Sequence, residues 1–211
     1  MTSPAATRLY LVRHGQVAGA RPRSYNGQQD VPLSPAGLEQ MQRLAEWAAA
    51  VELHAVYASD LQRAATAARL VADRRNIPLT LSPALREKHF GRWEGLTYGE
   101  AEARYPDEWR QWLSDPSDSR PPGGESYREV EERVIPLARR LLVEHAGRSV
   151  LLVAHGGVNR VILCHALDLP LQHVFRIEQD YAALNQIEYF PDGHRAVALL
   201  NGAVPGDLLV R

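Results

Sequence analysis

Two short hydrophobic segments, each closed by a histidine and a glycine, constrain this sequence more than any other feature. The first covers residues 9–12 and runs into Arg13 and His14, and the second covers residues 150–154 and leads to His155. Hydrophobic runs without polar alternation are typical of parallel strands that are buried on both faces. Ligands of open α/β sheets bind at the carboxyl ends of such strands. The pattern therefore predicts that both imidazoles lie at one edge of one sheet.

The composition narrows the class of protein. The chain has 211 residues, enough for one domain of ordinary size, and its 24 Lys and Arg balance 25 Asp and Glu to a net charge of -1. This balance gives no bulk attraction to nucleic acid or to an anionic membrane. Cys164 is the only cysteine, which excludes an intramolecular disulfide and a thiolate metal cluster. Because no leader sequence or long apolar run is present, we expect a soluble cytoplasmic protein.

Helix signals separate the predicted strands in the first half of the chain. Ser34 and Pro35 predict the start of one helix, and Asp60 is expected to cap a second helix over residues 61–75. This second helix carries Arg63 in its first turn, where the helix dipole disfavours a cation. An anion bound jointly by the arginine and the helix end would explain that position. A solvated surface arginine is the alternative that the pattern leaves open.

The second half of the chain contains two capping boxes. Thr97 with Glu100, and Ser126 with Glu129, each predict a helix start. Between the two, residues 114–125 form a connection rich in Pro and Gly. We therefore predict a helical, lid-like excursion over residues 97–125 above the sheet edge. The aromatic and apolar residues of its helix are expected to form a packing face, namely Tyr105, Trp109, Trp112 and Leu113.

The remaining elements complete the predicted architecture. Pro136 is expected to kink or locally break the helix that follows Ser126. A helix over residues 158–167 follows the second histidine motif, and residues 184–190 and 195–200 predict a hairpin at the sheet edge. The order of elements predicts an α/β fold, a three-layer α/β/α sandwich with a mostly parallel central sheet.

Three kinds of chemistry could use His14 and His155 together. A metal site is disfavoured, because the other histidines lack ligand spacing and Arg13 would repel a dication. A serine nucleophile is disfavoured, because the chain has no Gly-x-Ser-x-Gly elbow. Phosphoryl transfer uses arginines, imidazoles and a helix end around a dianion, with one imidazole as nucleophile. Gly15 and Gly156 are then expected to let the backbone approach the phosphate closely.

These motifs together resemble the histidine phosphatase superfamily, which includes cofactor-dependent phosphoglycerate mutases and alpha-ribazole phosphatases. The Arg-His-Gly signature follows the first strand, and further matching motifs recur in order through most of the chain. The matching segments are residues 11–15, 30–37, 59–64, 86–95, 122–126 and 154–157. The resemblance implies a phosphoglycerate mutase-like fold, a single domain over residues 1–211, and an activity without metal or other cofactor.

The resemblance also implies a role for each matched residue. His14 would be the nucleophile that becomes phosphohistidine. Glu87 would protonate the leaving alcohol and would then accept a proton from the attacking water. Arg13, Arg63 and His155 would hold the phosphoryl oxygens, through charge-assisted hydrogen bonds of about 1.5 to 3 kcal/mol each.

Five further residues are assigned to the same site. Gly156 is expected to bind phosphate with its backbone. Members of the family often carry Thr or Ser soon after Arg-His-Gly and an Asn shortly beyond, and this chain departs from that pattern. We therefore expect Asn26 or Gln28 to supply the missing phosphate contact. His89 and Trp93 lie in the same loop as Glu87 and are expected to line the pocket for the leaving group.

The short interval between Glu87 and His155 favours a phosphatase over a mutase, since mutases of this family carry longer lid segments there. We expect a metal-independent phosphomonoesterase acting on a small phosphorylated metabolite, either alpha-ribazole 5'-phosphate of cobalamin biosynthesis or a broad range of esters. A cofactor-dependent phosphoglycerate mutase and a non-catalytic phosphate-binding regulatory protein are the alternatives. The expected partner is the small-molecule substrate, with no nucleic acid and no membrane, and a homodimer stays open.

Overall fold

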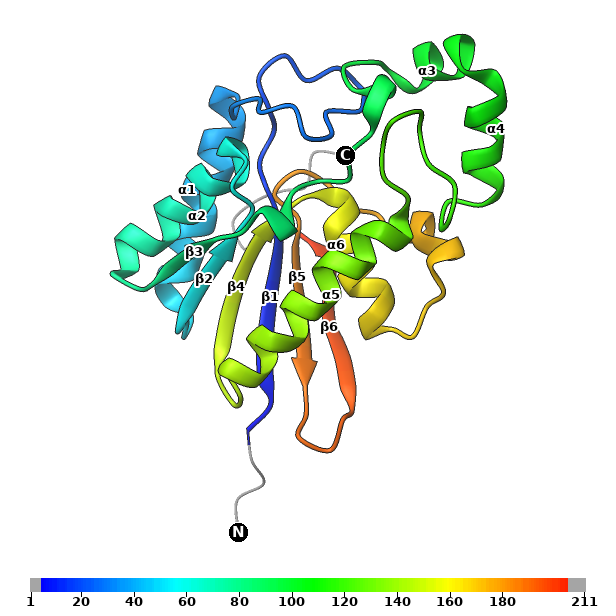
Figure 1. Ribbon diagram of the computed structural model, residues 1–211. Coiled ribbons are helices and arrows are strands. Elements are labelled where there is room, and N and C mark those ends of the chain that lie inside the picture. The colour runs from blue at the N-terminus through cyan, green and yellow to red at the C-terminus, as the bar shows by residue number, and fades with distance from the viewer. Residues whose placement is uncertain (1–4, 205–211) are drawn as a thin grey trace.

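The computed structural model describes residues 5–204 and places one six-stranded sheet between two layers of helices (Figure 1). The strand order is β3-β2-β4-β1-β5-β6, and the first four strands of that order pair in parallel. β5 pairs antiparallel with β1, and β6 pairs antiparallel with β5 to form the predicted hairpin. The strands are β1 (Thr7–Arg13), β2 (Ala55–Ala58), β3 (Leu79–Leu81), β4 (Ser149–Ala154), β5 (Leu184–Tyr189) and β6 (Arg195–Gly202). The predicted α/β sandwich with a mostly parallel sheet is confirmed.

The register of β1 and β4 brings the two histidine motifs to one edge of the sheet. Arg13 lies opposite Ala154 in the parallel ladder. The main-chain N–H of His14 donates to the carbonyl of Ala154 over 3.1 Å, one step beyond that pair. His155 follows Ala154 directly, so the two histidines leave neighbouring strands at the same level. This edge is at the top of the sheet in Figure 1.

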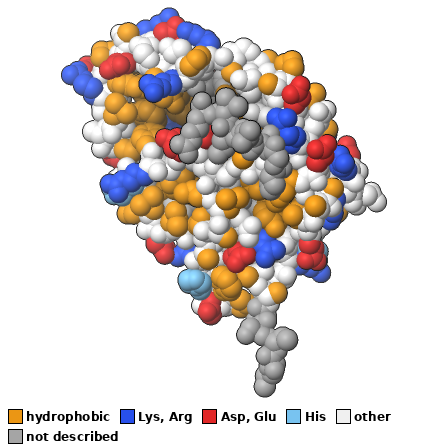
Figure 2. Space-filling view, turned by 180° about the vertical axis from the view of Figure 1, so that it is seen from behind, with side chains coloured by type: hydrophobic (Ala, Val, Ile, Leu, Met, Phe, Trp, Pro, Cys, Tyr) orange, Lys and Arg blue, Asp and Glu red, His pale blue; other side chains and the backbone are white. Residues whose placement is uncertain are grey.

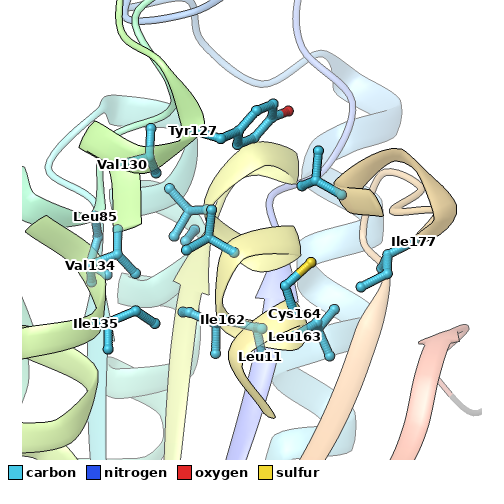
Figure 3. Close-up of a cluster of buried hydrophobic side chains, with 14 of the residues drawn as sticks. Leu11, Leu85, Tyr127, Val130, Val134, Ile135, Ile162, Leu163, Cys164 and Ile177 are labelled. Atoms are coloured by element: carbon cyan, nitrogen blue, oxygen red, sulfur yellow. The ribbon is translucent and has the colours of Figure 1, made fainter. Parts of the chain in front are cut away.

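Helices cover both faces of the sheet, as the uninterrupted hydrophobic strands require. Alternate residues of β1 enter different cores: Leu9 and Leu11 pack on the side of α5 and α6 (Figure 3), and Tyr10 and Val12 pack on the side of α1 and α2. The α-helices are α1 (Pro35–Ala50), α2 (Gln62–Arg75), α3 (Tyr98–Arg104), α4 (Pro106–Ser114), α5 (Tyr127–Glu144) and α6 (Gly156–Ala166). Short 3₁₀ turns are η1 (Pro83–Leu85), η2 (Gly91–Trp93) and η3 (Leu171–Arg176).

Most of the predicted helix starts are confirmed. The Ser34 hydroxyl accepts the main-chain N–H of Gly37 over 3.0 Å at the start of α1. Both capping boxes form, at Thr97 for α3 and at Ser126 for α5. Because α5 runs through Pro136 as one element, the expected local break does not occur.

The predicted cap of α2 is wrong, and its replacement shows how loops are fixed near the site. Asp60 does not cap the helix; its carboxylate instead accepts two hydrogen bonds from Arg86, over 2.8 and 2.6 Å. The first turn of α2 receives its acceptor from a distant loop, since the main-chain N–H of Gln62 donates to the Asp30 carboxylate over 2.7 Å. Sequence proximity favoured Asp60, but the folded chain brings Asp30 to the helix end.

The excursion over residues 97–125 lies above the carboxyl edge of the sheet, as predicted (Figure 1). It contains two helices rather than one, because Pro106 cannot continue α3 and begins α4 instead. Trp109 and Trp112 are buried and form the packing face, whereas Leu113 is 53% exposed.

The surface agrees with the balanced charge. On the face seen in Figure 2, positive and negative side chains are interspersed rather than gathered by sign. Within residues 5–204, none of the helices is both long enough and apolar enough to cross a membrane.

Candidate active site

Two buried imidazoles lie side by side at the carboxyl ends of β1 and β4. His14 is 3% exposed and His155 is fully buried. Their ring centroids are 5.0 Å apart and the ring planes are inclined at 66°. The prediction that both imidazoles meet at one sheet edge is therefore confirmed.

The hydrogen bonds of His14 fix its tautomer. Its Nδ1 lies 2.7 Å from the carbonyl oxygen of Gly15, and because a carbonyl only accepts, Nδ1 carries the proton. On the other side of the ring, Nε2 accepts the Nε–H of Arg63 over 3.2 Å. The Nε2 atom therefore holds a lone pair that points at a cation, which is the state that a nucleophilic imidazole requires.

Arg63 reaches this position from the first turn of α2, as predicted, and it is 1% exposed. Its two terminal nitrogens donate to the main-chain carbonyls of Gln29 and Gly27, each over 2.6 Å. The guanidinium is therefore held by the loop between β1 and α1 while its Nε faces His14. The surface alternative for Arg63 is excluded by this burial.

His155 differs from His14 in having no partner for its ring. Within residues 5–204, no group hydrogen-bonds to either ring nitrogen of His155. Burial, with the nearby Arg63 and Arg13 cations, holds the pKa of both imidazoles well below the usual 6.5. Both rings are consequently neutral in the free protein at neutral pH.

Arg13 contacts the segment before β5, which the sequence analysis did not assign to the site. Its Nη1 donates to the carbonyl of Gln179 over 2.5 Å, and its guanidinium carbon lies 4.1 Å from the ring centroid of Tyr181. The Tyr181 ring is also 5.7 Å from the ring of His14. The Gln179 side chain exchanges hydrogen bonds with Asn185, which in turn donates to the carbonyl of Leu11 in β1 over 2.9 Å.

Glu87 reaches the same group of side chains from the loop after η1. Its carboxylate accepts the main-chain N–H of Gly157, 3.1 and 3.2 Å from the two oxygens, and the N–H of Lys88 over 2.8 Å. The first turn of α6 therefore holds this acid beside His155. A Cβ atom on Gly157 would lie 2.5 Å from Oε1 of Glu87, so glycine is needed there for the carboxylate to fit.

Steric contacts give reasons for glycine in the two motifs, and the expected approach of Gly15 and Gly156 to phosphate stays a prediction. A Cβ atom on Gly15 would lie 2.4 Å from the carbonyl oxygen of Gly37, so this glycine permits close contact with α1. A Cβ atom on Gly156 would meet Arg13 at 3.6 Å, an ordinary contact. The steric requirement at the start of α6 therefore belongs to Gly157, one position later than expected.

The four remaining predicted residues are placed differently from one another. Gln28 donates through Nε2 to the main-chain carbonyl of Glu87 over 3.1 Å, so its amide stabilises the Glu87 loop. Asn26 makes no side-chain hydrogen bond within the described part of the chain. The side chain of His89 is 42% exposed, with Nε2 3.7 Å from the Glu94 carboxylate.

Trp93 is the predicted site residue that the structure contradicts. It is fully buried and packs against Tyr25, Trp109 and Trp112, with ring centroids 5.4 to 5.6 Å away. Trp93 is therefore part of the aromatic core beneath the excursion and does not line an open pocket. Trp93 does lie in the same loop as Glu87, but its side chain packs into the core and thereby fixes the loop.

Lys88 is a further residue that sequence reasoning missed. It is fully buried next to Glu87, and its Nζ lies 4.7, 5.5 and 5.9 Å from the ring centroids of Phe90, Tyr127 and Trp112. The ammonium group donates to the main-chain carbonyl of Glu125. Burial lowers the pKa of Lys88 to about 7, against the opposing effect of nearby carboxylates. No sequence signal marks this burial, because Lys88 stands among other charged residues such as Arg86 and Arg92.

The assembled groups suit a tetrahedral dianion. Two guanidinium groups and an unpartnered imidazole lie around a neutral imidazole whose Nε2 is unprotonated, and a carboxyl group held by the first turn of α6 lies at the side. Among residues 5–204, no three His, Cys, Asp or Glu side chains are grouped so that they could hold a metal ion.

Comparison with known proteins identifies the family of this chain. Residues 9–202 match the family model of the histidine phosphatase superfamily, branch 1. A bifunctional protein of Mycobacterium tuberculosis is 37% identical over 92% of this chain, and the matched region is 54% of that protein. The chain thus spans about half the length of that relative.

Other relatives match over most of both chains. A glucosyl-3-phosphoglycerate phosphatase of Mycolicibacterium vanbaalenii is 36% identical over 79% of this chain and 76% of its own, and an adenosylcobalamin/alpha-ribazole phosphatase of Escherichia coli is 30% identical over 82% and 86%. The solved structure of a mycobacterial glucosyl-3-phosphoglycerate phosphatase superposes with a TM-score of 0.85 at 28% identity, covering 94% of this chain and 100% of that one. With the motifs, the fold and the site in agreement, the chain belongs to the histidine phosphatase superfamily.

Proposed function

We propose that this chain is a metal-independent phosphomonoesterase that works through a phosphohistidine at His14. The observation that carries the proposal is the fixed tautomer of His14, whose Nε2 lone pair faces Arg63 at the centre of the anion-binding groups. A neutral imidazole can attack phosphorus only from an unprotonated nitrogen. The bond from Nδ1 to the Gly15 carbonyl leaves Nε2 as that nitrogen.

The first half of the reaction transfers the phosphoryl group to the protein. Nε2 of His14 forms a bond to phosphorus as the ester P–O bond breaks, and Arg13, Arg63 and His155 hold the phosphoryl oxygens. The departing alkoxide takes a proton from the Glu87 carboxyl group, and a positioned acid of this kind typically adds about 10² to 10⁴ in rate. Arg63 donates to a phosphoryl oxygen in place of Nε2 once the ester is bound.

The second half releases phosphate. A water molecule attacks phosphorus, the P–N bond to His14 breaks, and the Glu87 carboxylate accepts a proton from that water. Inorganic phosphate leaves, and both His14 and Glu87 return to their starting states. No step in this cycle requires a metal ion, because arginine and imidazole donors carry the charge stabilisation.

The proposed substrate is a small phosphorylated metabolite. Two named relatives act on phosphate esters of this size class, a glucosyl-3-phosphoglycerate and an alpha-ribazole phosphate. The short interval between Glu87 and His155 supports hydrolysis over isomerisation. We also propose that the enzyme acts in the cytoplasm, in small-molecule metabolism.

A phosphate-release assay with EDTA present tests the proposal. The panel is 4-nitrophenyl phosphate, alpha-ribazole 5'-phosphate, glucosyl-3-phosphoglycerate and 3-phosphoglycerate, with mutase product followed in parallel. We expect phosphate release without net isomerisation. A single ester hydrolysed far faster than the others identifies the physiological substrate class, and similar rates on several esters identify a broad phosphatase.

Two outcomes of that assay would overturn the proposal. Isomerisation of phosphoglycerate without phosphate release would place the chain among the mutases. An absence of turnover on every ester, together with an absence of acid-labile phosphate on His14, would instead favour a phosphate-binding regulatory protein.

A further inference from the structure

Arg133, a residue of α5 outside the phosphate pocket, uses all five of its N–H groups. Its Nη1 donates to the main-chain carbonyls of Ala84 and Arg86, each over 2.8 Å, and Nη2 donates to the carbonyl of Glu87 over 3.2 Å. Its Nε and Nη2 also form a two-bond pair with the Glu125 carboxylate, each over 2.9 Å. A guanidinium offers five donors in a rigid fork, and here every one of them has an acceptor.

Glu125 extends this contact to the other side of the Glu87 loop. Its Oε2 accepts the main-chain N–H of His89 over 2.8 Å, and its own N–H donates to the carbonyl of His89 over 2.8 Å. Its carbonyl accepts the buried Lys88 ammonium group. Arg133 and Glu125 together therefore hydrogen-bond to the backbone on both sides of Glu87, from residue 84 to residue 89.

The loop depends on these hydrogen bonds because it has no regular secondary structure between η1 and η2. The Glu87 side chain is fixed by the N–H groups of Gly157 and Lys88, but its backbone carbonyl is fixed by Arg133 and Gln28. Arg133 donates to three main-chain carbonyls within four residues of that backbone, those of Ala84, Arg86 and Glu87. Removal of the guanidinium would take one donor from each of those carbonyls and two donors from the partly buried Glu125 carboxylate.

We infer that Arg133 is a positioning residue for the acid Glu87. Through its hydrogen bonds to the loop backbone, it holds the Glu87 carboxyl group where that group can protonate the leaving oxygen. The inference rests on the proposed role of Glu87. Proton transfer to a leaving group is sensitive to placement, and a displacement of about 1 Å can cost about 10²-fold in rate. Within the described residues, the hydrogen bonds of Arg133 go to the Glu87 loop and to Glu125, and its charge also acts on His155 at a distance. We therefore expect its main effect on the step in which the leaving group is protonated.

A leaving-group series with Arg133→Met tests this inference. The readout is kcat/KM for phenyl phosphate and for 4-nitrophenyl phosphate, because kcat/KM reports the steps up to phosphorylation of His14. Phenoxide needs the proton from Glu87, whereas 4-nitrophenoxide leaves well without it. We expect kcat/KM for phenyl phosphate to fall about 100-fold, and to fall at least about tenfold more than that for 4-nitrophenyl phosphate.

The matched controls are Arg140→Met and Glu87→Gln. Arg140 lies on the same helix with its side chain 67% exposed, so its substitution is expected to leave both rates unchanged. Glu87→Gln is expected to show the same leaving-group dependence as Arg133→Met. In the double variant, Arg133→Met should add little to the loss already caused by Glu87→Gln.

The outcomes separate this inference from the proposed function. If Glu87→Gln shows leaving-group dependence but Arg133→Met lowers both rates equally, the positioning role is wrong and Arg133 only stabilises the fold. If Glu87→Gln itself shows no such dependence, the acid role in the proposed function is wrong.

Two milder variants keep the test informative if Arg133→Met does not fold. Arg133→Lys keeps the charge opposite Glu125 but cannot reach three carbonyls and a carboxylate together, and Glu125→Gln keeps the volume but weakens the paired bonds. Both are expected to show the same preference for loss on phenyl phosphate, at smaller magnitude. Equal losses on both esters in these variants would also contradict the inference.

Discussion

His14 and His155 end neighbouring strands and are both buried, yet their rings have opposite hydrogen-bonding states. His14 has a partner on each nitrogen, the Gly15 carbonyl and the Arg63 Nε. His155 has a partner on neither, within the described residues. An unpaired buried polar group costs about 1 to 3 kcal/mol, so the fold stabilises one imidazole and leaves the other in a strained environment.

The difference indicates two separate tasks for one residue type. In the proposed mechanism a nucleophile must present one particular nitrogen, which fits the fixed proton of His14. A group that binds an oxygen of a dianion gains most when no protein partner competes, which fits the role proposed for His155. The strand-His-Gly pattern is the same at both positions, and the neighbours alone create the distinction.

Removal of the nucleophile gives the largest expected effect. His14→Ala should lower kcat by about 10⁴- to 10⁶-fold, because no other group can form the covalent intermediate. The measurement is phosphate release together with detection of acid-labile phosphohistidine. His194→Ala is the control, since His194 is exposed on the β5–β6 turn and should retain full activity. Unaltered turnover in His14→Ala would refute every version of the histidine-nucleophile proposal.

Removal of the unpartnered ring is expected to separate activity from stability. His155→Leu should lower kcat/KM by about 10²- to 10³-fold through loss of a donor to the phosphoryl group. Its free energy of unfolding should nevertheless be unchanged or higher by about 1 kcal/mol, because no protein hydrogen bond is lost.

The matched comparison is His14→Leu, which deprives Gly15 and Arg63 of their partners. We expect this variant to be destabilised by about 1 to 3 kcal/mol relative to His155→Leu. Urea unfolding of both variants measures the difference. Equal destabilisation would mean that the two rings are not distinct in the way their hydrogen bonds indicate.

The two glycines after His155 allow a finer test of the same edge. Gly157→Ala places a Cβ atom 2.5 Å from Oε1 of Glu87 and should displace the carboxylate, lowering kcat/KM for phenyl phosphate by about 10- to 100-fold. Gly156→Ala meets Arg13 only at ordinary contact distance and should cost much less. A larger loss in Gly156→Ala would show that the phosphoryl group lies directly over that residue.

The pH dependence of stability tests both rings together. Both imidazoles have pKa values below the usual 6.5 in the folded protein, chiefly through burial, so the unfolded chain binds more protons below that pH. Stability should therefore fall as pH decreases below about 6.5, by up to about 1.4 kcal/mol per pH unit for each ring. In His155→Leu one of the two contributions should vanish. A series of urea unfolding curves from about pH 8 to about pH 5 measures the slope, and an unchanged slope in the variant would contradict this.

Features that depend on a few adjacent residues could be predicted from the sequence. Neighbouring residues alone predict the two histidine strands and the helix starts at Ser34, Thr97 and Ser126. They also predict the placement of Arg63 in a first helical turn. Each follows from a hydrophobic run or from one capping pattern. The family resemblance then linked these separate motifs into one site.

Features that depend on distant contacts could not be predicted. Tyr181 reaches Arg13 from a turn before β5, and Arg133 reaches the Glu87 loop from the middle of α5. Nothing in the neighbouring residues of either one marks it. Trp93 was misplaced for the same reason, since a tryptophan in an active-site loop packs inward when Tyr25 and Trp109 meet it there.

The contact between α1 and the segment that follows β1 has a consequence for how this sequence can vary. A Cβ atom on Gly15 would lie 2.4 Å from the carbonyl of Gly37, and one on Gly37 would lie 1.9 Å from the carbonyl of Gln16. Both clashes are with backbone, which side-chain repacking cannot relieve. A library randomised at positions 15 and 37 and selected for folding alone, even in an inactive His14→Ala background, should return glycine at both positions.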